Sequence, residues 1–404
     1  MNSIIYIITN FFRYAALGVP YFYHKSLIIQ SQRWNLSDCE QFGRKRLERK
    51  ILKFGNDINS KNMMKKKLDK MTILGNNILC KTASTGGTTG TPFTFKVNRF
   101  FNRQKERAYM HSMWSEIGYN PFDNIVAFRG NASNKLIKYN WIDNSFEISI
   151  NKINTTNIDI LIKRLKKIDG FFLHVYPSSL YTFIDLIGEK TFSELNIKGV
   201  LAGSEKFPLE KMKYFEQNYG IPISHWYGQS EYVSLAKFCK YCSGFHFFPT
   251  YGYTEFISRN NDNFSSIIST SFHNIGTNFV RYDTEDLVEI DNNECEKPFK
   301  RVKEIVGRNE EYFIDRTGLK RAFGPFLFGI HNEFWTKIKN IQFVHNAEGS
   351  LSVEIILIHK EDYSLIANFL QERFNCVNLE IKVVNSLKKT VSGKHKYFIN
   401  NTNK

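Results

Sequence analysis

The chain has 404 residues, of which 42% are hydrophobic and 15% aromatic, so it can build a sizeable core and is not intrinsically disordered. Its length predicts two or three domains. The formal net charge is +16, but no nucleic-acid-binding signature accompanies the scattered Lys and Arg residues, so we expect no nucleic-acid partner. Six scattered cysteines are too few for a disulfide framework and favour a reducing, cytoplasmic setting.

The residues up to Tyr23 are strongly apolar and aromatic. Arg13 interrupts them, no basic segment precedes them, and no uninterrupted apolar run is long enough to cross a bilayer. We interpret this stretch as a buried N-terminal segment. The alternative is contact with a membrane surface through the aromatic side chains and Arg13, which would place the protein peripherally at the inner face of the membrane. Residues 36–70 are charged and helical in character.

Residues 82–92 read Thr-Ala-Ser-Thr-Gly-Gly-Thr-Thr-Gly-Thr-Pro, with three glycines, several hydroxyl side chains and no acidic residue. Glycine lets the backbone adopt positive φ and approach a ligand closely. Hydroxyl groups and bare backbone N–H groups then form a concave set of donors suited to phosphate. The loop is not of the Walker type, because no Gly-Lys-Ser/Thr follows, and a plain linker is the alternative. Its candidate phosphate-binding residues are Ser84, Thr85, Gly86, Gly87, Thr88, Thr89 and Gly90.

After this loop, helical and strand patterns alternate along the chain. The predicted elements are a helix over 99–117, a strand over 124–128, a helix over 156–168 capped by Thr156, a strand over 171–176, a strand over 197–201, a helix between Pro208 and Gly220, and a strand over 222–226. Such alternation predicts a parallel sheet flanked by helices. Ligands of these sheets bind beyond the carboxyl ends of the strands.

Polar turns follow three of the predicted strands, and we expect them to meet at one edge of the sheet. They are Tyr176-Pro177-Ser178-Ser179, Gly203-Ser204-Glu205 and Tyr227-Gly228-Gln229-Ser230-Glu231. The third turn combines an aromatic plate for a base (Tyr227) and a glycine for close approach (Gly228). It also has a hydroxyl (Ser230) and a carboxylate (Glu231), which suit phosphate and Mg²⁺.

The glycine-rich loop and the Tyr227–Glu231 turn resemble two motifs of the adenylate-forming enzymes, most closely those of phenylacetate–CoA ligases and CapK-type capsular polysaccharide proteins. The resemblance implies that the loop holds the phosphates of ATP. It also implies that Tyr227 stacks on adenine, that Ser230 contacts phosphate and that Glu231 binds Mg²⁺. Gly203, Ser204 and Glu205 belong to the same expected nucleotide site.

Residues 279–286, Phe-Val-Arg-Tyr-Asp-Thr-Glu-Asp, resemble the Arg-Tyr-x-Thr-Gly-Asp motif of the same family. The final carboxylate, here Asp286, is implied to bind the two ribose hydroxyls, since an ionised carboxylate accepts both O–H groups. This chain departs from the motif at two positions. Glu285 replaces the glycine, and Asn278 stands where a proline is usual.

Gly307-Arg308 matches the Gly-Arg hinge of the family, which implies that Arg308 lies near the ribose. From about residue 309 the chain has the pattern of a separate small domain, with a strand over 351–358, a helix over 363–374 and a strand over 379–384. Residues 388–394 resemble the C-terminal Pro-x-Gly-Lys motif, with Val391 in place of the proline. Lys394 is therefore the expected mobile catalytic lysine.

Cys239, Cys242 and His246 form a Cys-x-x-Cys-x-x-x-His run, whose spacing suits Zn²⁺. Phenylacetate–CoA ligase-like proteins often carry a similar run just after the Tyr-Gly-x-Ser/Thr-Glu turn. A structural zinc site needs a fourth ligand, for which the candidates are His225, His273 and Cys295. The competing interpretation is two buried thiols and a surface histidine.

Together these motifs predict an α/β protein. A large N-terminal adenylate-forming domain (1–306) would hold mixed and parallel sheets flanked by helices, and a small, mobile α+β domain (307–404) would carry the catalytic lysine. The resemblance implies an AMP-forming acid–thiol ligase that uses ATP, Mg²⁺ and a carboxylic acid. The acyl acceptor would be CoA or an amine or hydroxyl group of a sugar, in capsular or surface polysaccharide biosynthesis.

Two further interpretations of the sequence stay open. The altered motif positions fit a catalytically degenerate protein that binds a nucleotide or acyl-adenylate without turnover. The aromatic N-terminus and the positive charge fit a peripheral membrane partner of a glycan assembly complex.

Overall fold

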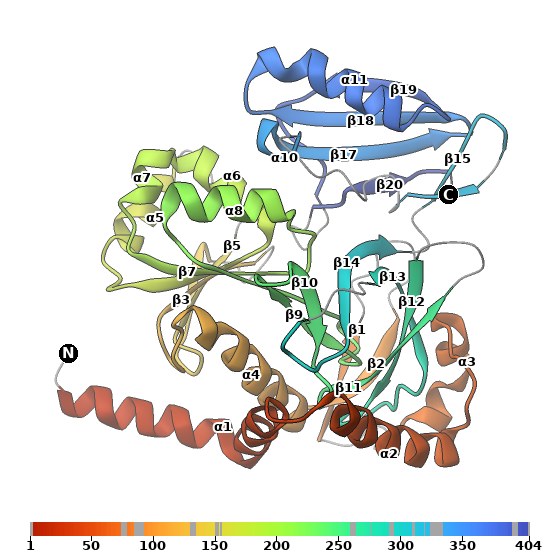
Figure 1. The fold of residues 1–404 in the computed structure, drawn as a ribbon. Coiled ribbons are helices and arrows are strands. Elements are labelled where there is room, and N and C mark those ends of the chain that lie inside the picture. Colours follow the sequence, from red (N-terminus) through yellow and green to blue (C-terminus); the bar gives the residue numbers. More distant parts are fainter. Residues whose placement is uncertain are drawn as a thin grey trace. The chain divides into compact units, whose positions relative to one another are not determined.

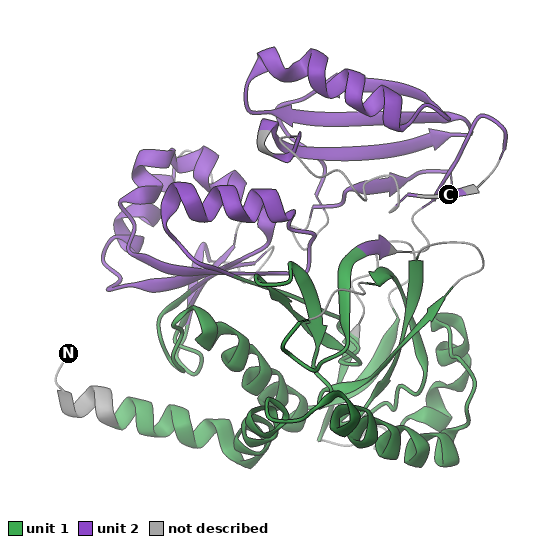
Figure 2. Ribbon diagram, viewed as in Figure 1, with its two compact units in different colours: residues 1–125, 140–145, 224–305 green, residues 126–139, 146–223, 306–404 purple. Residues whose placement is uncertain are grey.

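The computed structural model describes residues 3–73, 79–84, 93–129, 135–149, 153, 156–258, 264–274, 276–290, 295–308, 312–318, 320–323, 334–389 and 395–402. The chain forms two compact units, which Figure 2 shows in different colours. Unit 1 combines residues 1–125, 140–145 and 224–305, and unit 2 combines 126–139, 146–223 and 306–404. Unit 2 thus contains the C-terminal part of the chain together with an α/β layer from its middle. The predicted mobile domain over 307–404 stays a prediction.

The helices of unit 1 are α1 (Ser3–Ser31), α2 (Leu36–Phe54), α3 (Lys61–Met71) and α4 (Phe101–Trp114), which a 3₁₀ turn (Ser115–Ile117) extends. Local sequence signals set their ends. The side chain of Asn35 accepts a hydrogen bond from the Asp38 amide (2.9 Å), and the carboxylate of Asp38 accepts one from the Asn35 amide (3.0 Å). These two bonds satisfy two backbone donors at the start of α2. Gly118, at φ 87°, closes the turn after α4.

The strands of unit 1 form a two-stranded and a larger sheet. The small antiparallel sheet joins β1 (Cys80–Ser84) to β2 (Thr94–Asn98). In the larger sheet the order is β11 (Gly252–Ser258), β12 (Phe264–Ser271), β13 (Tyr282–Ile290), β14 (Arg301–Arg308), β10 (Gly244–Phe247), β9 (Leu235–Cys239) and β8 (Ile223–Gly228). A core that includes Phe93, Phe95, Val233, Phe279 and Tyr282 joins the small sheet to β13 (Figure 1).

The middle part of unit 2 is the predicted α/β layer. Its strands lie in the order β7 (Ile197–Gly203), β6 (Phe171–Val175), β3 (Ile125–Arg129), β5 (Ser145–Ser149) and β4 (Ile137–Asn140), and β6 and β7 run parallel. Its helices are α5 (Ile158–Leu165), α6 (Pro177–Ile187), α7 (Glu189–Ser193) and α8 (Leu209–Tyr219). As predicted, α8 lies between Pro208 and Gly220, and Gly220 has φ 67°.

The C-terminal part of unit 2 is α+β. A four-stranded sheet has the order β19 (Asn378–Val383), β18 (Ser350–Leu357), β17 (Ile338–Ala347) and β20 (Phe398–Asn400), beside the β15 (Tyr312–Ile314) and β16 (Lys320–Ala322) pair. The helices are α10 (Phe334–Lys337) and α11 (Tyr363–Arg373), and a 3₁₀ turn (Lys360–Asp362) precedes α11. Ile366, Leu370 and Phe374 pack with Phe343 and Val353 in one apolar core.

The predicted class, a mixed α/β fold, is confirmed, and most predicted elements are present. Two expectations need correction. The helix predicted over 156–168 starts at Ile158 with Asn157 at its N-cap, so Thr156 does not occupy the cap position. The N-terminal segment is buried on one face only, since Leu17 and Tyr21 are buried while Phe11 and Val19 are exposed. Among the described residues, no helix combines the length and the apolar character that crossing a bilayer requires.

Candidate functional site

The Tyr227 turn lies where β8 ends, as predicted. Tyr227 pairs with Ala236 of β9, and its ring packs against Phe247 with ring centroids 5.9 Å apart. The Tyr227 hydroxyl donates a hydrogen bond to Oδ2 of Asp286 at 2.6 Å, although the two residues are 59 positions apart. Burial, and then the negative charge of Asp286, raise the pKa of Tyr227 well above its ordinary value, so the phenol keeps its proton. Two of the sequence motifs therefore meet in one hydrogen bond.

The Glu231 carboxylate, in the same turn after β8, is buried. Its Oε1 accepts a hydrogen bond of 3.0 Å from the hydroxyl of Tyr282, which is also buried. Burial and the charge of Glu231 raise the pKa of Tyr282, with smaller contributions from Glu285 and Asp286. Tyr282 is thus a positioning residue for Glu231, a role that was not predicted from the sequence. Its place inside the 279–286 motif was the sequence signal from which a role in the site could have been predicted.

A bulge in β13 presents Asp286. Asp283 pairs with Ile268 and Leu287 pairs with Ser266, so the three residues between Asp283 and Leu287 lie opposite a single residue of β12. Such bulges re-aim side chains beside functional sites. Glu285 has φ 65°, in the left-handed region that favours glycine. This conformation explains why the family motif has glycine here, and the chain retains the bulge despite the substitution.

The segment before residue 75, to which no motif was assigned, supports this strand from the N-terminal side. The backbone amide of Asn59 donates to the carbonyl of Arg281 at 2.8 Å. The amide of Asn278 donates to the carbonyl of Met71, also at 2.8 Å. Proline has no amide hydrogen, so the asparagine at position 278 allows a bond that the usual proline would not.

In unit 2, the second polar turn contacts the first. Glu205 accepts two hydrogen bonds from Ser178, one from its amide (3.0 Å) and one from its hydroxyl (3.1 Å), at the start of α6. An anion is favoured there because the first amides of a helix have no partner within it. Glu205 also accepts a bond of 2.6 Å from the amide of His395. Ser204, beside it, has φ 67°.

The loop that carries Lys394 is held at both ends. Lys389 and His395 form an antiparallel bridge, and Nε2 of Gln342 donates to the carbonyls of Lys388 and Lys396, each at 2.9 Å. Burial lowers the pKa of His395 to about 4, so its ring is neutral. Its Nε2 lies 2.8 Å from the carbonyl of Ile341, which fixes the proton on that nitrogen. The ends of this loop are therefore tied to β17 and to Glu205.

Several predicted site residues lie outside what the structure describes. They are Lys394 and the phosphate-loop residues Thr85, Gly86, Gly87, Thr88, Thr89 and Gly90, while Ser84 and Arg308 are described only by their backbone. The strands that flank the loop are described, and Ser84 pairs with Thr94 across β1 and β2. Gly228 and Ser230 are exposed at the end of β8. The roles of all these residues stay predictions.

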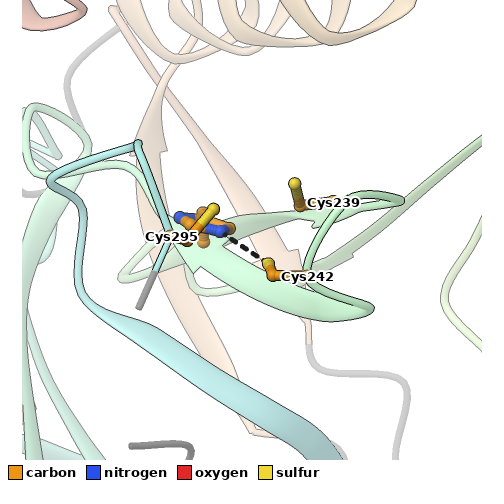
Figure 3. A group of neighbouring side chains, drawn as sticks. Cys239, Cys242 and Cys295 are labelled. Atoms are coloured by element: carbon orange, nitrogen blue, oxygen red, sulfur yellow. Dashed lines mark hydrogen bonds between the residues drawn. The ribbon is translucent and has the colours of Figure 1, made fainter. Parts of the chain in front are cut away.

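Cys239, Cys242, His246 and Cys295 form a separate cluster in unit 1. One potential ligand atom of each residue lies within 4.8 Å of those of the other three, and Figure 3 shows the three labelled cysteines near one another. Sγ of Cys242 lies 3.1 Å from Nε2 of His246. Cys239 ends β9, Cys242 lies in the following turn and His246 is on β10, so the β9–β10 hairpin supplies three of the four.

The structure selects Cys295 among the three candidates for a fourth ligand. The His225 ring instead packs against Phe245, with centroids 5.5 Å apart, and the His273 ring packs against His24 at 4.4 Å. Three thiols and one imidazole are a ligand set that structural zinc sites use. The donor chemistry and spacing therefore fit Zn²⁺.

No protein-family profile matches the sequence. Protein CapK of Staphylococcus aureus is 23% identical over 379 residues, which cover 85% of this chain and 79% of CapK. Two solved structures of 2-hydroxyisobutyryl-CoA ligase in the postadenylation state, in complex with R3-HIB-AMP and with 2-HIB-AMP, have TM-scores of 0.61 and 0.59. Each shares 13% identity and covers 95% of this chain and 89% of the ligase chain. The fold is that of the adenylate-forming ligases.

The predicted resemblance to CapK-like, adenylate-forming proteins is confirmed, since the chain is similar to CapK in sequence and to these ligases in fold. Within this fold, the described part of the candidate site is acidic and aromatic, and it contains two separate hydrogen-bonded pairs, Tyr227 with Asp286 and Tyr282 with Glu231. The buried Glu231 carboxylate supplies the hard oxygen ligand that Mg²⁺ prefers. The donor chemistry of this residue therefore fits the predicted metal.

Proposed function

We propose that the chain is an ATP-dependent, AMP-forming ligase of carboxylic acids. In the first half-reaction, a carboxylate oxygen attacks the α-phosphorus of ATP, the bond between the α- and β-phosphates breaks, and pyrophosphate leaves. In the second, a nucleophilic acceptor attacks the acyl carbonyl, loses a proton and displaces AMP. The first step brings two anions together, so it needs positive charge and preorganised donors at the phosphates.

The single observation that carries this proposal is the pairing of Tyr227 with Asp286 and of Glu231 with Tyr282. Each pair joins the Tyr227–Glu231 turn after β8 to β13, two strands that are not adjacent in the sheet. In the proposed roles, the ring of Tyr227 contacts adenine and Asp286 accepts hydrogen bonds from the ribose hydroxyls. Glu231 would hold Mg²⁺, which supplies positive charge to the phosphates when it is bound.

Lys394 and the phosphate loop have the remaining proposed roles. Thr85 to Gly90 would donate to the phosphates through backbone amides and hydroxyls. Lys394 would meet the negative charge that develops during adenylate formation. In support, the amide of its neighbour His395 donates a hydrogen bond to Glu205 of the predicted Gly203–Glu205 turn.

For the acceptor, we propose CoA or an amine or hydroxyl group of a sugar. The similarity to CapK supports a role in capsular or surface polysaccharide biosynthesis. Both ATP and CoA are cytoplasmic metabolites, so this chemistry belongs in the cytoplasm. We also propose that zinc in the Cys239–Cys295 cluster is structural, because four protein ligands leave no open position for catalysis.

Pyrophosphate release from ATP, measured over a panel of carboxylic acids with and without CoA, tests the proposal. The expected result is acid-dependent release, with acyl-CoA detected by mass spectrometry if CoA is the acceptor. Asp286→Asn should weaken ATP use, whereas Glu361→Gln, an exposed carboxylate on the 3₁₀ turn before α11, should not. ATP binding without turnover for any acid would instead favour the degenerate binding protein, for which the altered positions Glu285 and Val391 are the motivation.

A further inference from the structure

Helix α1 is apolar on two faces, but the protein covers only one of them. The covered face packs along α4 (Figure 1) and comprises Arg13, Leu17, Tyr21, His24 and Ile28, all at most 6% exposed. α1 consists of two helical segments, because Gly18 inside it has a non-helical φ of 65° and ψ of 176°. The exposed apolar residues include Ile8 (50% exposed), Phe11 (68%) and Phe12 (57%) before Gly18, and Val19 (81%), Phe22 (49%) and Ile29 (53%) after it. We call these six residues the outer stripe. A helix that is apolar all round is normally buried all round, so the outer stripe indicates a missing partner.

All charged residues from the start of α1 to Arg33 are cationic. The first acidic residue of the chain is Asp38, whereas Lys25 and Arg33 precede it and are both exposed. Residues 1–75 contain fourteen Lys and Arg against five Asp and Glu, so nine of the sixteen net positive charges fall in this segment. An apolar stripe flanked by cations is complementary to a surface that is apolar below and anionic at its edge.

The geometry allows α1 to lie on a membrane but not to cross it. Nε of Arg13 donates to the carbonyl of Trp141 at 2.8 Å, and its Nη2 donates to Asn144 at 3.0 Å, so its charge is directed into the protein. The alternative raised from the sequence had Arg13 at the membrane surface, and this part of it is wrong. These bonds hold the segment of α1 before Gly18 against the rest of unit 1, so Phe11 and Phe12 are presented at a fixed position.

We propose that the outer stripe of α1 binds the surface of an anionic lipid membrane. Phe11, Phe12 and Val19 would enter the boundary between headgroups and acyl chains. Lys25 and Arg33 would contact anionic headgroups. This property is independent of the proposed ligase activity.

The test is co-sedimentation of the full-length chain with vesicles of phosphatidylcholine alone and of phosphatidylcholine with phosphatidylglycerol. Wild type should bind the anionic vesicles, and added salt should weaken binding. The triple variant Phe11→Ser, Phe12→Ser, Val19→Ser should lose at least tenfold in vesicle affinity, because apolar area drives such binding. The double variant Lys25→Gln, Arg33→Gln should lose about fivefold per removed cation on anionic vesicles only.

The matched control carries three serine substitutions at exposed apolar residues elsewhere, Tyr139→Ser, Ile160→Ser and Leu365→Ser. It should bind vesicles as wild type does. Thermal melting and pyrophosphate release verify that all variants are folded. Equal vesicle binding by the triple variant and wild type would overturn the proposal. A second result would also overturn it: wild type does not bind vesicles but forms a dimer in sedimentation velocity, and the triple variant does not form this dimer. The partner of the outer stripe would then be a second copy of the chain.

Discussion

At the scale of single residues, the candidate site depends on two phenol–carboxylate pairs. Glu231→Gln keeps the size and the hydrogen bond to Tyr282 but removes the charge. We expect pyrophosphate release to fall by about 10²–10³, the usual effect of one lost electrostatic contact at a reacting phosphate. Tyr282→Phe leaves the charge of Glu231 but removes one hydrogen bond that positions it, so its loss should be smaller and should be relieved in part by higher Mg²⁺. Unchanged rates in Glu231→Gln would remove its metal role.

Glu285 offers a second test at this scale. At φ 65° an L-residue is strained by roughly 1 kcal/mol relative to glycine, so Glu285→Gly should raise the melting temperature by a few degrees and keep activity. As the control, Glu304→Gly in β14 should lower it, because glycine inside a strand costs conformational entropy. A destabilised Glu285→Gly variant would mean that the carboxylate makes contacts that outweigh the strain.

Lys211 predicts a pH dependence. It is buried in unit 2, where Nζ donates to the carbonyl of Lys339 at 2.8 Å, and burial lowers its pKa from 10.5 to about 7. Between these values the unfolded chain binds a proton that the folded chain lacks, so the free energy of unfolding rises with pH. The contribution reaches at most about 1.4 kcal/mol per pH unit.

Thermal melting of wild type and Lys211→Met at about pH 7 and about pH 9 isolates this contribution from other titrating groups. The advantage of the variant should be largest at the lower pH and shrink at the higher one. Parallel pH profiles for the two proteins would show that Lys211 stays charged in the folded state.

At the scale of elements, the cysteine–histidine cluster supports the strand that carries Tyr227. Three of its residues come from the β9–β10 hairpin, and β9 pairs directly with β8. If zinc is bound, folding and metal binding are coupled, because the ligands come together only in the folded chain. Cys295→Ser should therefore lower both the zinc content and the melting temperature. Cys376→Ser, a cysteine outside the cluster, should change neither, and purified wild type without zinc would contradict the metal site.

At the scale of the whole molecule, the proposed reaction predicts that Lys394 serves one half-reaction. Its ammonium neutralises charge while carboxylate and phosphate oxygens are forced together, but it has no such task once the acyl-adenylate exists. Lys394→Ala should slow adenylate formation by roughly 10²-fold, and transfer from preformed acyl-adenylate should stay near the wild-type rate. Lys388→Ala is the control and should affect neither half-reaction. Lys389 is less suitable as a control, because its Nζ donates a hydrogen bond to Thr182 at 3.3 Å. Equal damage to both half-reactions would argue against domain rotation.

The amino-acid sequence by itself determined the local structure and the chemistry of the motifs. Pro208 and Gly220 bound α8 because their backbone preferences act within a few residues. The Tyr227–Glu231 turn and Asp286 were recognisable because their order and spacing along the chain are distinctive. The ligase fold followed from the same order of motifs.

Only the tertiary structure decided which distant residues meet. Cys295, and not His225 or His273, completes the metal cluster. Cys295 is 49 positions from His246 in the sequence, so local spacing could not identify it as a neighbour. The support of β13 by Asn59 uses backbone groups, which leave no side-chain signature in the sequence. Which face of α1 stays open depends on what packs against the helix. The sequence pattern of apolar residues is the same whether a face is covered or not.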